Sequence, residues 1–205
     1  MKIKTENAVI SISEGNMKTG TIPAFSLTPG RSCSATACKT CLKEGCYAMK
    51  SYRMYKNTRT AWDGNTDAVV DHLPVFEQAM NEYFSSMTAP RFFRVHVAGD
   101  FISREYAEAW ARIAAAAPGT MFLAFTKQWD NVRGIDFPEN FSLVLSGWIG
   151  TMIPEDLRAV YPVADCVEKG CEIPAGSIEC PGHCDTCGRC WFLKKSGCNV
   201  AFHKH

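Results

Sequence analysis

Hydrophobic and polar positions in the middle of the chain follow two different periods. Residues 92–99, FFRVHVAG, alternate apolar side chains with Arg94 and His96, which predicts a half-buried strand. After Ser103, a suitable helix cap, apolar positions recur every three or four residues until Pro118. This spacing gives a helix one apolar face, formed by Tyr106, Trp110, Ile113, Ala114 and Ala117.

Strand and helix patterns continue to alternate on both sides of this unit. Strands are predicted over residues 23–28, 121–127, 141–148 and 163–167. Helices are predicted over residues 47–59, 66–87 and 154–160, with Pro74 breaking or kinking the second. Such alternation predicts an α/β fold with a parallel sheet and right-handed helical crossovers. Roughly four or five units are too few for a closed eight-unit barrel, which leaves a partial (β/α) barrel or an open sheet.

Polar side chains collect where the predicted strands end. In parallel sheets, ligands bind beyond the carboxyl ends of the strands. Each predicted strand also has an apolar side and a smaller or more polar side. We expect the apolar sides to face helices and the polar sides to face a pocket. The pocket predicted in this way is lined by His96, Asp100, Thr126, Lys127 and Ser146.

Each of these polar residues has a structural interpretation beside the functional one. His96 titrates near neutrality and could bind a ligand or shuttle protons, or it could be a hydrogen-bonded core residue. Asp100 could anchor the amine of a ligand, or it could cap the turn into the next helix. Lys127 could bind a phosphate or a carboxylate, or it could end its strand in solvent. The sequence leaves both roles open for all three residues.

The composition is that of a globular protein without a strong overall field. Its 205 residues correspond to one domain, or one with a small appendage, and 46% of them are hydrophobic. The formal net charge of +1 does not point to nucleic acid or to a membrane surface. No stretch is apolar enough for a secretory signal or for the roughly 20 residues of a membrane span, so a cytoplasmic protein is expected.

Cysteine is the residue type that departs from this ordinary composition. There are eleven, an odd number, and cytosolic thiols stay reduced, so metal or cluster ligation is favoured over a disulfide framework. The first group has the spacing C-x4-C-x2-C-x4-C and consists of Cys33, Cys38, Cys41 and Cys46. Four thiolates can close a tetrahedral zinc site or hold a 4Fe-4S cluster. Zinc ligands usually form two pairs separated by a longer loop, so one short loop favours the cluster.

The second cysteine group lies near the end of the chain and has the spacing C-x3-C-x2-C-x2-C. It consists of Cys180, Cys184, Cys187 and Cys190. We expect a second cluster of the ferredoxin kind here, or a structural zinc knuckle. Three cysteines stay unassigned: Cys166, Cys171 and Cys198. The predicted organisation is therefore a partial barrel with a cysteine loop over residues 1–165, and a cysteine-rich metal- or cluster-binding subdomain over residues 166–205.

A basic and aromatic pattern covers the predicted helix after the first cysteine group. Four basic residues interleave with three tyrosines: Lys50, Arg53, Lys56 and Arg59 with Tyr47, Tyr52 and Tyr55. Such a surface could follow a phosphate backbone while bases stack on the rings. It could equally be a solvated helix face with the tyrosines packed beneath it.

Several short motifs, taken in order, resemble the phage "gene product 88" family. They are GNMKTGTIPAFSLTPGRSC, CYA at 46–48, HVAGDF at 96–101, FTK at 125–127, CGRCW and the closing VAFHKH. Together they extend from about Gly15 to His205. Members of this family occur in phages and mobile elements.

The CYA end of the cysteine loop also resembles a broader set of radical-SAM-like proteins. This resemblance implies a partial (β/α) barrel, a 4Fe-4S cluster after the first strand, and S-adenosylmethionine as a further cofactor. It also implies a Gly/acidic motif after the second strand, which Gly99 and Asp100 would match. From their places at the strand ends, Thr126 and Ser146 are expected beside the cofactor. The first loop departs from the radical-SAM pattern because it lacks the C-x3-C-x2-C spacing.

The function expected from these features is that of an iron–sulfur redox enzyme. It would transfer one electron from a donor to a small-molecule substrate, with His96, Asp100 and Lys127 in catalytic positions. One alternative is a non-catalytic electron carrier, which predicts four-cysteine clusters and no small-molecule binding. Another is a zinc-stapled nucleic-acid-binding module, which predicts zinc and salt-dependent binding through residues 50–59.

Overall fold

The structure is a computed structural model, and it describes residues 1–33, 46–148 and 152–203. Within these residues a nine-stranded sheet has the spatial order β1-β2-β3-β4-β5-β6-β7-β9-β8. All neighbours from β3 to β8 run parallel, whereas β1 and β2 form an antiparallel edge beside β3. The strands are β1 Lys2–Lys4, β2 Val9–Ser13, β3 Ala24–Phe25, β4 Phe92–Val95, β5 Met121–Thr126, β6 Phe141–Ser146, β7 Val163–Val167, β8 Ser177–Glu179 and β9 Asn199–His203.

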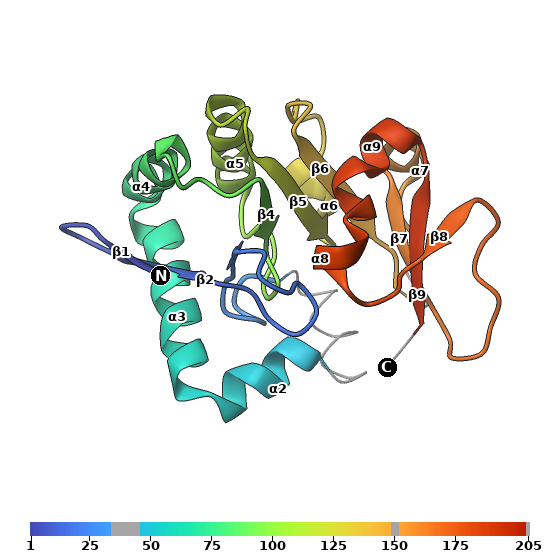
Figure 1. The fold of residues 1–205 in the computed structure, drawn as a ribbon, viewed down its shortest axis with the longest axis horizontal. Coiled ribbons are helices and arrows are strands. Elements are labelled where there is room, and N and C mark those ends of the chain that lie inside the picture. Colours follow the sequence, from blue (N-terminus) through green and yellow to red (C-terminus); the bar gives the residue numbers. More distant parts are fainter. Residues whose placement is uncertain (34–45, 149–151, 204–205) are drawn as a thin grey trace.

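Helices lie in the connections from β3 to β7 and from β8 to β9, and Figure 1 shows α3, α4 and α5 together beside the N-terminal half of the sheet and α8 and α9 beside its C-terminal half. They are α2 Tyr47–Met54, α3 Lys56–Asp71, α4 Leu73–Ser85, α5 Arg104–Ala116, α6 Trp129–Val132, α7 Glu155–Arg158, α8 Cys184–Cys187, the 3-10 helix η1 Arg189–Phe192 and α9 Leu193–Ser196. From β3 to β7, strands that follow one another in the chain are also neighbours in the sheet. The mixed α/β class with parallel strands is therefore confirmed.

Local signals explain where several elements begin and end. Ser103 caps α5, because its hydroxyl oxygen accepts a hydrogen bond from the backbone N–H of Tyr106 at 3.2 Å. Pro74 lies in the first turn of α4, where its missing N–H has no effect, so it starts a helix instead of kinking one. The helix predicted over residues 66–87 is thus two helices, separated at His72. The strand predicted over residues 92–99 ends at Val95.

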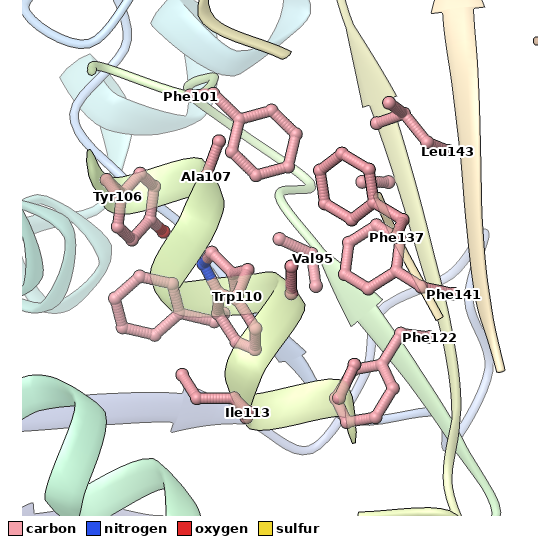
Figure 2. Close-up of a cluster of buried hydrophobic side chains, with 14 of the residues drawn as sticks. Val95, Phe101, Tyr106, Ala107, Trp110, Ile113, Phe122, Phe137, Phe141 and Leu143 are labelled. Atoms are coloured by element: carbon pink, nitrogen blue, oxygen red, sulfur yellow. The ribbon is translucent and has the colours of Figure 1, made fainter. Parts of the chain in front are cut away.

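The main hydrophobic core lies between the sheet and the helices α3, α4 and α5. Figure 2 shows its aromatic part, which includes Tyr106 and Trp110 of α5, Phe122 of β5 and Phe141 of β6. The ring of Phe122 lies edge-on to Trp110, with centroids 6.2 Å apart, and stacks on Phe141 at 6.0 Å. These side chains are fully buried, and each contributes about 1.5–3 kcal/mol to folding through burial.

A second hydrophobic core lies on the opposite face of the sheet. On β5, Phe122 and Ala124 belong to the main core, whereas Leu123 packs in the second core with Trp191 and Leu193. The expectation that the side of Ala124 and Thr126 faces a pocket is therefore wrong for β5. The expectation fails because both faces of β5 are covered: helices pack on one face, and the C-terminal segment packs on the other.

The cysteine-rich C-terminal segment both extends the sheet and crosses its face. Its strand β9 lies between β7 and β8 in the same sheet. Two hydrogen bonds attach the segment between its strands to the central strands. The indole N–H of Trp191 donates to the carbonyl oxygen of Phe93 at 3.3 Å, and the hydroxyl of Ser142 donates to the carbonyl oxygen of Cys190 at 2.8 Å. Residues 177–203 therefore share the sheet of the preceding strands.

Candidate metal centre

The four cysteines of the second group line one pocket beside the second core. Cys180 follows β8, Cys184 and Cys187 are the first and last residues of α8, and Cys190 lies in η1. All four side chains are partly buried. Apolar side chains form much of the remaining wall: Ile178, Trp191, Leu193 and Val200. The fold thus brings four thiols and an apolar wall to the same place.

Backbone contacts fix the short connections between these cysteines. The N–H of Cys180 donates a hydrogen bond to the carbonyl oxygen of Ala201 on β9 at 2.8 Å. The N–H of Cys184 donates to the carbonyl oxygen of Lys18, also at 2.8 Å. Gly188, with φ of 62°, ends α8 in the left-handed conformation and turns the chain toward Cys190. A glycine suits this position because a side chain there would be strained.

The N-terminal hairpin Asn16–Gly20 packs against the first residues of α8, Cys184 and Asp185. A Cβ atom on Gly20 would lie 2.0 Å from a carboxylate oxygen of Asp185, so this contact needs a glycine. The GNMKTG motif therefore supports the cysteine-bearing helix, although about 165 residues separate them in the chain.

Burial favours the protonated form of two thiols of this pocket, those of Cys184 and Cys190. It raises the pKa of Cys190 to about 12 and also raises the pKa of Cys184, while the positive charge of Arg94 opposes both shifts. A metal ion or cluster would have to displace these protons, so binding would depend on pH. In the described part of the chain, no three His, Cys, Asp or Glu side chains are grouped closely enough to hold a metal ion.

The first cysteine group is only partly within the described residues. Cys33 and Cys46 are described and partly buried, whereas Cys38 and Cys41 lie outside the described residues. Before Cys33, the hydroxyl of Ser32 donates to the carbonyl oxygen of Thr28 at 2.8 Å. After Cys46, the hydroxyl of Tyr47 donates to the carbonyl oxygen of Val97. Both ends of this cysteine loop are therefore attached near the carboxyl ends of β3 and β4.

Asp100 joins the ends of β4 and β5. Its buried carboxylate accepts hydrogen bonds from the hydroxyl of Thr126 at 2.6 Å and from the N–H groups of Lys127 and Phe101 at 2.8 Å. Burial raises the pKa of Asp100, and these hydrogen bonds oppose the shift. The structure thus brings Asp100 and Thr126 together, as the sequence predicts, with all of these contacts internal to the protein.

Gly99 lets this junction approach the first cysteine loop closely. Its φ is 80°, and a Cβ atom there would lie 2.5 Å from Oγ of Ser32 and 2.6 Å from Cβ of Leu27. The N–H of the next residue, Asp100, donates to the same Ser32 hydroxyl at 3.3 Å. Gly99 is therefore a residue of close backbone packing at the start of the cysteine loop.

His96 faces the helix layer and not the cysteine pocket. Its φ of 64° breaks the alternation of β4 and turns the imidazole toward α5, where Nε2 lies 2.8 Å from the hydroxyl oxygen of Tyr106. The ring also packs edge-on against Phe101, with centroids 4.9 Å apart. Burial, together with the charge of Arg94, lowers the pKa of His96 to about 3, so the imidazole is neutral at physiological pH.

Lys127 belongs to this junction through its backbone N–H, which donates to Asp100, whereas Ser146 lies on the other face of the sheet. The ammonium group of Lys127 lies 5.4 Å from the ring centroid of Trp148, a cation–π distance. Ser146 is buried on the side of β6 that carries Val144, which belongs to the second core. Thr126 shares its side of β5 with Ala124 of the main core. Thr126 and Ser146, both expected around one pocket, therefore lie on opposite faces of the sheet.

Arg94 is a site residue that sequence reasoning missed. It alternates with Phe93 and Val95 of the main core and therefore points to the face covered by the cysteine-rich segment. Burial lowers the pKa of Arg94, and the nearby groups of Tyr47, Cys184, Cys190 and Cys180 oppose this shift. The alternation of residues 92–95 indicated its side of the strand, but nothing in the sequence indicated what lies opposite.

These features define a mixed α/β protein whose cysteine-rich end packs on its own parallel sheet. The chain belongs to the family described as Gene product 88, which matches residues 1–168. It is 27% identical over 132 residues to the Gene 88 proteins of Mycobacterium phages L5 and D29, which covers 60% of this chain. The match spans 55% of the length of these relatives. No solved structure matches the chain.

The family match confirms the resemblance to the phage "gene product 88" proteins and limits where it applies. The motifs CGRCW and VAFHKH lie beyond residue 168, outside the matched residues. The first cysteine group lies within the match, and the second does not. Among the described residues, no helix has the length and apolar character needed to cross a membrane.

Proposed function

We propose that this protein is an iron–sulfur protein that holds a 4Fe-4S cluster on Cys180, Cys184, Cys187 and Cys190. The observation that carries the proposal is that these four thiols and several apolar side chains line one pocket. Among the described residues no three ligating side chains are yet close enough to share a metal ion, so the thiols would have to draw together around a cluster. An apolar, partly closed surrounding suits a redox centre because solvent exposure is one of the factors that set its potential. A zinc ion on the same four thiols is the alternative that the experiment must separate.

A second cluster on Cys33, Cys38, Cys41 and Cys46 belongs to the same proposal. Support comes from the position of this loop, which begins behind β3 and ends beside Val97, after β4. Ligands of parallel sheets bind at this end of the strands. The two cysteine groups would then give the chain two redox centres.

A radical-SAM-like redox enzyme is the more specific form of this proposal. It is supported by the consecutive order of β3 to β7, with a cysteine loop after β3 and Gly99 and Asp100 after β4. Asp100 already accepts three hydrogen bonds, and a carboxylate has about four acceptor positions. One position would remain for the amine of S-adenosylmethionine. An electron carrier without a substrate would need only the clusters.

The proposal is tested by anaerobic purification with iron, sulfide and zinc analysis and an optical spectrum. Cys187→Ala removes one thiol of the pocket, and Cys171→Ala removes an exposed thiol outside it. We expect brown wild-type protein with about four iron and four sulfide per cluster. We expect Cys187→Ala to lose one cluster and Cys171→Ala to keep both. Colourless protein with stoichiometric zinc would refute the redox function.

Nucleic-acid binding is a second candidate function, favoured by one surface. Tyr47 and Tyr55 are 66% and 56% exposed beside four exposed basic residues, Lys50, Arg53, Lys56 and Arg59. By contrast, Tyr52 stacks on Trp62 and donates to Asp63, so it belongs to the protein interior side of α2. Exposed rings next to cations are suited to bind single-stranded nucleic acid.

This second candidate is tested by charge reversal on α2 and α3. Arg53→Glu with Lys56→Glu changes the charge of this surface, and Lys2→Glu with Lys4→Glu makes the same change in charge on the edge strand β1. We expect the first pair alone to weaken salt-dependent binding of an oligothymidylate, measured by fluorescence anisotropy. Equal binding by both double variants would refute the assignment.

A further inference from the structure

Two cations lie over aromatic rings at the carboxyl ends of the central strands. The guanidinium carbon of Arg94 on β4 lies 4.2 Å from the ring centroid of Phe125 on β5. The ammonium nitrogen of Lys127, just after β5, lies 5.4 Å from the ring centroid of Trp148, shortly after β6. Strands β4, β5 and β6 are neighbours in the sheet (Figure 1), so the two cation–aromatic pairs follow each other across its centre.

Alternation along the strands relates these pairs to one face of the sheet. Phe93 belongs to the main core, so Arg94 points to the opposite face, where Phe125 packs against the second core. Arg94 is in register with Leu123, and its guanidinium reaches the ring of Phe125. Lys127 continues the alternation of Leu123 and Phe125 and lies two residues beyond Phe125, about 7 Å along the strand direction. The two cations are therefore separated by several ångströms along β5.

Most hydrogen-bond donors of these two side chains have no acceptor within the described residues. Of the guanidinium N–H groups of Arg94, the one on Nε donates to the carbonyl oxygen of His96 at 3.1 Å, and the others have no partner in the described part of the chain. Lys127 donates there through its backbone N–H, to Asp100, and not through its ammonium group. Both side chains are half-buried, so their unused donors are accessible to a solute and only partly screened by water.

The carboxylates of the described residues leave both charges largely uncompensated. None of them forms an ion pair with Arg94 or Lys127. Asp100 already accepts hydrogen bonds from Thr126, Phe101 and the backbone of Lys127. Burial, the largest influence, raises the pKa of Asp100, although the charge of Lys127 opposes this shift. Asp100 therefore gives Lys127 only a partial counter-charge.

The chemistry of the two cations suits a ligand with two anionic groups. The planar guanidinium of arginine can donate parallel hydrogen bonds to a carboxylate or a phosphate, and the ammonium group of lysine binds such groups as a point charge. The rings of Phe125 and Trp148 hold each cation on one side and leave its remaining donors free. Ligands of parallel sheets also bind at this end of the strands.

We propose that Arg94 and Lys127 bind a small molecule with two separated anionic groups, phosphate or carboxylate, at the carboxyl ends of β4, β5 and β6. The guanidinium of Arg94 binds one anionic group, and the ammonium group of Lys127 binds the other. This inference goes beyond the proposed function and requires no metal centre.

Isothermal titration calorimetry at fixed ionic strength tests the site with three probes. Inorganic tripolyphosphate and glutarate each carry separated anionic groups, and inorganic phosphate is the compact control. Arg94→Met and Lys127→Met each remove one cation of the site. Arg91→Met removes a matched cation outside it, because the guanidinium carbon of Arg91 lies 5.3 Å from the ring centroid of Phe92, at the amino end of β4. Far-ultraviolet circular dichroism checks that each variant is folded.

We expect the wild type to bind tripolyphosphate or glutarate with a Kd below about 1 mM and inorganic phosphate at least about tenfold more weakly. The tighter of the two extended probes identifies the site as one for phosphate or for carboxylate. Arg94→Met and Lys127→Met should each raise the Kd at least about tenfold, and Arg91→Met should change it less than about twofold.

Three results would overturn the site: a wild type that binds neither extended probe, a folded site variant with unchanged Kd, or equal weakening by Arg91→Met. Lys127 lies beyond the end of β5, so Lys127→Met tests the site even where Arg94→Met does not fold. None of these results depends on the iron content of the protein. Failure of this inference therefore leaves the proposed iron–sulfur function standing, and absence of iron leaves this inference standing.

Discussion

Replacing His96 by glutamine removes a buried titratable group from the interface of β4 and α5. The amide of glutamine can reach toward the hydroxyl of Tyr106, which lies 2.8 Å from Nε2 of His96. The pKa of His96 is lowered to about 3 in the folded protein, primarily by burial, whereas an unfolded histidine titrates near 6.5. The folded and unfolded chains therefore bind different numbers of protons between these two pH values.

The sign and size of the effect follow from this difference. Below pH 6.5 the unfolded chain takes up a proton that the folded chain excludes, so the free energy of unfolding falls as the pH falls. The loss is about 1.4 kcal/mol per pH unit within the window, which gives about 2 kcal/mol between pH 7 and pH 5. The raised pKa of Asp100 acts in the opposite direction, since the folded state binds that proton first, but this contribution is present in both proteins.

Urea unfolding of the wild type and of His96→Gln, followed by tryptophan fluorescence at pH 7, 6 and 5, measures the difference. We expect the wild type to lose about 2 kcal/mol more than the variant over this range. The variant will be less stable at pH 7, but the comparison concerns slopes and is independent of that offset. Equal slopes in the two proteins would show that His96 titrates normally in the folded state, and the argument from burial would be refuted.

Two further substitutions test packing at the site. Gly99→Ala should lower the free energy of unfolding by about 2–4 kcal/mol, because φ is 80° and the new Cβ would lie 2.6 Å from Cβ of Leu27. Gly134→Ala, at φ of 70° with no atom within 4 Å, adds only backbone strain and should have a smaller effect in the same urea titration. Trp191→Phe should destabilise the protein by about 1–3 kcal/mol, because it leaves the carbonyl oxygen of Phe93 without its indole donor. Unchanged stability of Trp191→Phe would exclude an anchoring role for this hydrogen bond.

The central strands and helices were predictable because each has a hydrophobic pattern within a few neighbouring residues. The predicted strand 121–127 corresponds to β5, Met121–Thr126, and the predicted helix after Ser103 corresponds to α5, Arg104–Ala116. Hydrophobic side chains repeat every two residues in a half-buried strand and about every 3.6 residues in a helix. The cysteine spacings likewise defined two candidate groups, and the second group does line one pocket.

The strands at the two ends of the sheet, β1, β2, β8 and β9, were not predicted from the sequence. Strands β1 and β8 are the two edges of the sheet and have three residues each, too few for an alternating pattern to stand out. Strand β9 lies between β7 and β8, an order that no local pattern specifies. A strand pattern states that a segment can pair, but the partner is chosen by the packing of the whole sheet.

The sequence by itself determined the element types, the strand-to-helix order and the residues able to ligate a metal. Only the tertiary structure decided which face of the sheet a polar side chain occupies and which segment packs against that face. The positive φ of His96 turned its ring toward α5, and the C-terminal segment covered the face on which Arg94 lies. Periodicity fixes a side chain's direction relative to its own strand, whereas what lies opposite depends on segments up to about a hundred residues away. For this reason Phe92 of β4 and Trp191 of the C-terminal segment, which pack edge-on with ring centroids 5.4 Å apart, come together only in the folded protein.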